Sequence, residues 1–183
     1  MGFIVIALII VIALGAFVWQ RDEPKREAAL QTSLDAMQGF SPALTLFGAD
    51  GGTGVALDPN ARAVGLLQPN RPATRVEASR VLGADLYQDG QRIGTVTRDG
   101  AQARLATLRE RQPAPAAPPS PRGEQVPMDT VHRVELRLWI DNDTNPTHDV
   151  RLLDREVRNT DAAFKEAVAA GEGWLAQLSA LLR

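Results

Sequence analysis

The sequence predicts an α+β protein: an N-terminal transmembrane helix, then an antiparallel β-sandwich or barrel of about seven strands, closed by a C-terminal amphipathic helix. Three observations support this class. Residues 2–19 carry no charge, short apolar runs alternate with turn residues over 41–97 and 131–153, and an apolar stripe at helical spacing runs from Phe164 to Leu182. We therefore expect one soluble domain tethered to a bilayer.

Residues 2–19 read GFIVIALIIVIALGAFVW and contain no proline. As a helix this run would cover about 27 Å at roughly 1.5 Å per residue, close to the hydrocarbon thickness of about 30 Å. A cleaved signal peptide would need a cationic leading region and a short apolar core, whereas only Met1 and Gly2 precede this run, which continues to Trp19. We expect a retained, single-pass membrane anchor that contacts the lipid bilayer.

The charges that flank this span predict its orientation. Arg21, Lys25 and Arg26 follow it closely, and acidic residues count little in the positive-inside rule. Trp19 suits the headgroup layer, where one edge of the indole ring is hydrated. We expect the soluble part on the cytoplasmic side of the inner, or plasma, membrane.

Composition narrows the classes of function. The formal net charge of −2 gives no electrostatic basis for binding nucleic acid, which draws on clustered cations. The absence of cysteine excludes disulfides, thiolate metal sites and a cysteine nucleophile. His132 and His148 are the only histidines, so a multi-histidine metal centre is not expected, and we predict no metal and no cofactor.

Residues 20–41 are predicted to form a juxtamembrane helix or linker. Asp22 can cap a helix, Pro24 suits its first turn, and Gly39 can end it in a left-handed conformation. The apolar face would rest on the domain or on the membrane surface and comprises Leu30, Leu34 and Met37. A dimerising coiled coil is the less favoured alternative, because the pattern covers too few heptads.

Short apolar runs separated by strong turn formers follow, and they predict antiparallel meanders. Asp89-Gly90 is typical of a two-residue hairpin turn, and Gly83 indicates a bulge or bend. Gly48 to Gly54 resembles a phosphate-binding loop but lacks its lysine and a following helix, so a hairpin turn is expected there. The predicted strands are Ala43–Phe47, Gly54–Leu57, Ala63–Gln68, Arg75–Val81, Ala84–Gln88 and Arg92–Thr97.

The next two segments break this pattern. Residues 101–111 are ambiguous, because Leu105 and Leu108 could face one side of a helical turn or belong to a strand. Residues 112–128 form a proline-rich insertion, where proline blocks helical and ladder hydrogen bonds, so we expect an extended loop. The spacing also matches ligands of polyproline-binding modules, but a plain linker is the preferred interpretation.

The strongest strand signal is Val131–Ile140, where apolar and charged residues alternate, and a second strand is predicted over Thr147–Leu153. The turn between them opens like a calcium loop at Asp141, Asp143 and Asn145. Pro146 replaces the glycine that such a loop requires, so turn chemistry is the expected role. Asn159 or Thr160 would cap the final helix.

The sequence contains, in this order, Phe47-Gly48, Gly54 to Asp58, Val134 to Leu138, Asn145-Pro146 and Val150 to Leu153, followed by the closing helix. This order resembles that of uncharacterised bacterial single-span proteins with a PH-like domain. The resemblance covers residues 42–183 and implies an adaptor-like domain with no catalytic residues to carry over. The chain would then comprise an anchor at 2–19, a linker at 20–41 and a PH-like domain at 42–183.

The expected function is that of a non-enzymatic binding or adaptor domain at the cytoplasmic face of a bacterial inner membrane. Its ligand would be a protein partner or anionic lipid headgroups, with cations available at Arg71, Arg75, Arg80, Arg92 and Arg98. One alternative is a structural subunit of a membrane or envelope assembly. The other is a hydrolase that uses His132 or His148 with Asp141, Asp143 or Asp149.

Overall fold

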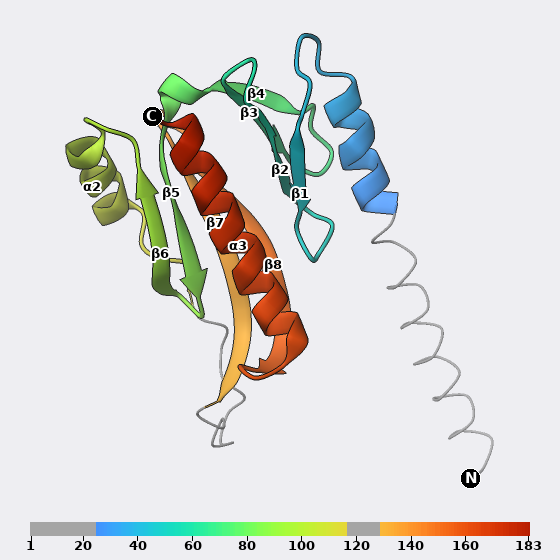
Figure 1. Ribbon diagram of the computed structural model, residues 1–183, viewed down its shortest axis with the longest axis vertical. Helices are drawn as coiled ribbons and strands as arrows, with labels where there is room; N and C mark the ends of the chain where they lie inside the picture. The colour runs from blue at the N-terminus through green and yellow to red at the C-terminus, as the bar shows by residue number, and fades with distance from the viewer. Residues whose placement is uncertain (1–24, 117–128) are drawn as a thin grey trace.

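A computed structural model describes residues 25–116 and 129–183 as an α+β fold with two four-stranded antiparallel sheets (Figure 1). The span predicted at 2–19 and most of the proline-rich tract lie outside these residues. Across the part of the chain that is described, no helix has the length and apolar character needed to cross a bilayer.

The first sheet is an antiparallel meander, as the spacing of its turns predicts. The fourth predicted strand is shorter than expected, because the chain turns through a 3-10 helix, η1 (Ala78–Arg80), before the next strand begins. The glycine-rich residues between the first two strands form a hairpin turn, as expected, with Phe47 opposite Gly54. The strands are β1 (Leu44–Phe47), β2 (Gly54–Asp58), β3 (Ala63–Leu67) and β4 (Thr74–Glu77).

The second sheet has the order β6-β5-β7-β8, so it is not the simple meander that the sequence predicts. β7 pairs with β5 because the chain leaves β6 through a helix and a long connection and returns on the other side. Asp89 and Gly90 adopt positive φ in a tight hairpin turn, and the register shifts beside Gly83. The strands are β5 (Val81–Gln88), β6 (Gln91–Thr97), β7 (Thr130–Ile140) and β8 (Thr147–Arg158).

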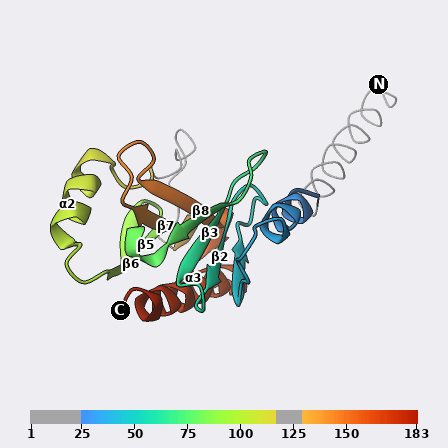
Figure 2. The ribbon, with the colours of Figure 1, turned by 90° about the horizontal axis from the view of Figure 1, so that it is seen from above.

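Three α-helices cover these sheets within the described residues. A helix over residues 25–35 lies on the outer face of the first sheet, where Leu30 and Leu34 pack with Ala56 and Leu67. The predicted apolar face of this helix therefore rests on the domain. α2 (Gln102–Arg111) resolves the ambiguous segment as a helix. α3 (Ala162–Leu181) follows β8 as predicted and crosses the second sheet (Figures 1 and 2).

One core joins both sheets to α3. Val55 and Val64 of the first sheet, Leu136 of the second and Leu178 of α3 are all inaccessible to solvent in this cluster. The sheets are not closed into a barrel, which corrects the barrel form of the prediction, and there are eight strands rather than seven in the described residues. The sheets are instead two layers that share this core, with the C-terminal helix against it.

Two long-range polar contacts hold the layers together. Arg62, in the turn between β2 and β3, donates to the carbonyl oxygens of Leu181 and Arg183, both at 2.9 Å. His148 of β8 lies between the sheets, and its Nε2 is 2.8 Å from the carbonyl oxygen of Gly54. These contacts fix the position of the first sheet relative to α3 and β8.

Candidate functional site

A groove of about 920 Å³ lies where the β1–β2 hairpin approaches β8 and the first half of α3. One wall is formed by Leu46 and Phe47, and the other by small side chains of α3. The floor is β8, where a bulge opposite Val134 and Glu135 places the consecutive residues Leu152 and Leu153 in the groove. The bulge therefore widens the apolar floor.

The hairpin meets β8 at one end of this groove. The amide of Ala49 donates to the carbonyl oxygen of Arg151 at 2.7 Å. The side chain of Arg151 contacts Asp50 at 3.5 Å and Asp154 at 3.2 Å, which joins the hairpin to the floor by ion pairs. The groove thus has a fixed, polar end.

Three further charges stand on the rim of the groove: Arg26, Arg155 and Glu166. No hydrogen bond or ion pair joins the side chain of Arg26 or Arg155 to another of the described residues. Arg26 comes from the first turn of the described part of the N-terminal helix, so the segment that follows the predicted membrane span contributes to the rim. An apolar floor with a few charges at its edge suits a segment of another chain or an amphipathic ligand.

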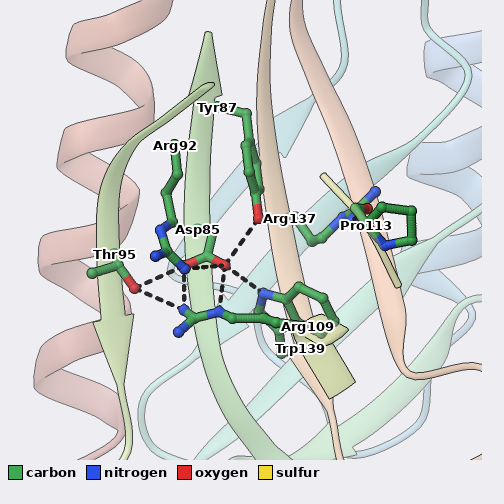
Figure 3. A network of polar contacts seen from close by, with 8 residues as sticks. All are labelled: Asp85, Tyr87, Arg92, Thr95, Arg109, Pro113, Arg137 and Trp139. Carbon is green, nitrogen blue, oxygen red and sulfur yellow. Dashed lines mark hydrogen bonds and ion pairs between the residues drawn. The ribbon is translucent and has the colours of Figure 1, made fainter. Parts of the chain in front are cut away.

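A buried polar network occupies the outer face of the second sheet, away from the groove (Figure 3). Asp85 of β5 has no solvent-exposed surface. Its two oxygens accept five hydrogen bonds, from Tyr87 (3.2 Å), Thr95 (2.7 Å), Trp139 (2.8 Å) and, through two nitrogens, Arg109 of α2 (3.0 and 2.5 Å). This carboxylate has its acceptor capacity filled, so it fastens α2 to the sheet.

Arg137 of β7 extends the same face. It forms a two-pronged ion pair with Asp149 of β8, at 2.7 and 2.8 Å, and donates to the carbonyl oxygen of Pro113 at 2.9 Å. Its guanidinium also lies 5.7 Å from the ring centre of Tyr87 and 5.5 Å from that of Trp139. These contacts hold the start of the proline-rich tract against the sheet (Figure 3).

Glu135 is the polar group of this face with incomplete bonding. Its side chain is 5% exposed, and Oε2 is buried with no hydrogen-bond partner. Burial, with a smaller contribution from the charge of Asp149, raises the pKa of Glu135 despite the neighbouring arginines. The protonated carboxyl group is therefore the form that this environment favours.

The residues of the hydrolase alternative are not brought together. His148 faces the core between the sheets, and burial lowers the pKa of its imidazole. Asp149 is adjacent in the strand and points to the opposite face, where it binds Arg137. Asp141 and Asp143 pair instead with Arg104 of α2. His132 stands near the start of β7, where its amide donates to Asp89 at 3.0 Å.

The turn whose first residues resemble a calcium loop is stabilised by its own polar side chains, as expected. Asn142 accepts from the amide of Thr144, and the two aspartates bind Arg104. No group of three His, Asp or Glu side chains that could hold a metal occurs in the part of the chain described by the structure.

The five arginines considered for lipid binding do not form one cluster. Arg75 pairs with Glu77, Arg80 binds the carbonyl oxygen of Asp141, and Arg71 contacts Gln68. Arg92 approaches Asp85 at 3.8 Å, and Arg98 has a buried Nε without a hydrogen-bond partner. Sequence reasoning missed both Asp85, which sits in an apolar run, and the groove, which arises where four distant segments meet.

Comparisons with known proteins found no matching protein family, no matching curated protein and no matching solved structure.

Proposed function

We propose that this protein is a membrane-anchored, non-enzymatic binding module that presents its groove to a protein partner at the cytoplasmic face of a bacterial inner membrane. The observation that carries the proposal is the groove itself, with its apolar floor, small-residue wall and charged rim. A surface of this form binds by burying apolar side chains, with the rim charges selecting among partners.

The state of the polar groups supports binding over catalysis. Catalysis needs a nucleophile, a base and an orienting group within hydrogen-bond reach of one another and of a substrate. The most elaborate polar cluster is centred on Asp85, which is buried and filled with donors, and His148 is held by a backbone carbonyl. The hydrolase remains an alternative that activity screening of His132→Ala and His148→Ala variants would test.

The architecture supports a PH-like domain. Two antiparallel sheets and a C-terminal helix that packs against the core between them are the features on which the resemblance depends. The position of β7 beside β5, reached through α2 and the proline-rich tract, is the feature that a relative would need to share. A structural subunit of an envelope assembly is the second candidate, and it would use the same groove in a complex of fixed ratio.

A protein ligand suits the groove better than lipid does. The groove floor is β8, the edge strand of the second sheet, whose outward backbone polar groups, apart from the Arg151 carbonyl that accepts from Ala49, would lose water without gaining partners if an acyl chain covered them. The arginines proposed for headgroup binding are dispersed and largely engaged with other residues. A polypeptide can satisfy a strand edge and fill the apolar floor together.

Photo-crosslinking tests the proposal in native membranes of the full chain. Ala170 lines the groove, whereas Ala169 is exposed on another face of α3. With p-benzoylphenylalanine at position 170 we expect a discrete protein adduct, and at position 169 none. Ala163→Trp, which fills the groove, should remove the adduct, and the matched Ala176→Trp variant should retain it. Equal adducts at 169 and 170, or none at 170 in a chain with native thermal unfolding, would refute the proposal.

A further inference from the structure

The groove lies close to the point where the chain would leave the membrane. The helix over residues 25–35 is not a free linker, because Leu30 and Leu34 are buried against the first sheet. Ser33 strengthens this contact by accepting a hydrogen bond from the amide of Ala73 at 2.7 Å. The domain core therefore fixes this helix against the first sheet (Figure 1).

Chain length then limits how far the groove can stand from the bilayer. Arg26 lines the rim, and seven peptide steps separate it from Trp19, the last residue of the proposed span. Those steps cover about 24 Å when fully extended and about 10 Å when helical. The headgroup region itself is roughly 6 Å thick on each side. The rim is thus held at the membrane surface or within a short distance above it.

The charges of the rim add a chemical preference. Arg26 and Arg155 have no charged partner among the described residues, while Arg151 is already shared by Asp50 and Asp154. Glu166 is the acidic member of the rim. An incoming segment that carries acidic side chains would satisfy the two arginines, and apolar side chains would cover Leu152 and Ala170.

We infer that the groove receives the juxtamembrane segment of a second membrane protein, a short apolar stretch with acidic residues. This inference rests on the proposed function and on the membrane span proposed for 2–19. A segment that emerges from the same bilayer is confined to the height of the groove, so its effective concentration at the rim far exceeds that of a soluble chain of equal affinity.

Lengthening the tether tests this inference. A twenty-residue Gly-Ser spacer between Asp22 and Glu23, in the chain with p-benzoylphenylalanine at position 170, raises the tether from about six to about 26 residues. Effective concentration falls roughly as the −3/2 power of tether length, so the yield of the adduct should fall roughly ninefold. Replacing residues 22–24 by Gly-Ser-Gly is the control of unchanged length and should leave the yield within about twofold of the parent chain.

Two further readouts decide the chemistry of the partner. The partner identified from the adduct should, in its uncrosslinked form, resist alkaline extraction, as an integral membrane protein does. Arg155→Glu should lower its yield at least fivefold, while Arg158→Glu, on an exposed residue outside the groove, should not. A protein partner that alkali extracts when it is not crosslinked and whose adduct yield does not depend on the spacer, or an adduct to lipid, would overturn this inference. Loss of every adduct from the chain without a spacer would instead reject the proposed function.

Discussion

Replacing Arg109 by alanine is expected to destabilise the protein by about 3 kcal/mol, because it removes one partner of a buried ion pair. Asp85 has no exposed surface and would lose two of its five hydrogen bonds together with its closest cation. Breaking such a pair typically costs about 3–5 kcal/mol. The lower end applies here because Arg109 is 26% exposed and Asp85 keeps three other donors.

Arg104 provides a matched control on the same helix. Its side chain is 36% exposed and pairs with Asp141 and Asp143 at the surface, so Arg104→Ala should lower stability by less than about 1 kcal/mol. Urea unfolding of the detergent-solubilised chain, followed by far-ultraviolet circular dichroism, measures both changes. Asp85→Asn combined with Arg109→Ala should destabilise by at least about 1 kcal/mol less than the sum of the single variants. Equal losses in the two arginine variants, or a loss below about 1 kcal/mol for Arg109→Ala, would refute the reasoning.

Four further results are expected. Because the pKa of Glu135 is raised, this residue stabilises the fold below the ordinary glutamate pKa, and the contribution is lost as pH rises. Glu135→Gln should therefore raise the free energy of unfolding by about 1 kcal/mol at pH 8 and change it little at pH 4, as measured by urea unfolding. Equal effects at the two pH values would contradict this reasoning. The lowered pKa of His148 means that stability is full above pH 6.5 and declines as pH falls through the lower, folded-state value, and His148→Gln should flatten that decline in thermal melts. Gly171→Ala should destabilise the protein by about 1 kcal/mol, because the added methyl group would meet the buried side chain of Leu86. Gly173→Ala should stabilise it by up to about 1 kcal/mol, because the added methyl group would have no atom within 4 Å. Changes of the same sign in both variants would count against the packing described. Because the chain has no cysteine, Ala169→Cys offers a single site for an impermeant maleimide. The maleimide should label this site only after the inner membrane is opened. Labelling in intact spheroplasts would reverse the proposed orientation.

Local patterns predicted the individual strands well because each carries its own period and its own turn residues. Alternation over Val131–Ile140 and the Asp89-Gly90 turn both correspond to observed structure. The position of β7 beside β5 was beyond such reasoning, because pairing between strands separated by a helix and a long connection leaves no local signal. For the same reason the sequence left a sandwich and a barrel both open, and the structure has two separate layers.

The candidate site was less predictable than the fold. The groove is formed by residues from the N-terminal helix, a hairpin, β8 and α3, and no single stretch of sequence shows that they meet. Asp85 lies within the otherwise apolar β5, and that anomaly was the one available signal of a buried polar network.

The contact between Arg62 and the last turn of α3 has a consequence for synthesis of the chain. The carbonyl oxygens that the Arg62 guanidinium binds belong to residues 119 and 121 positions further along the chain. Until β5–β8 and α3 have been synthesised, the inner face of the first sheet has neither the second sheet nor α3 to cover it. A nascent chain paused after β4 therefore exposes an aggregation-prone surface, which is covered only after β5–β8 and α3 have left the exit tunnel.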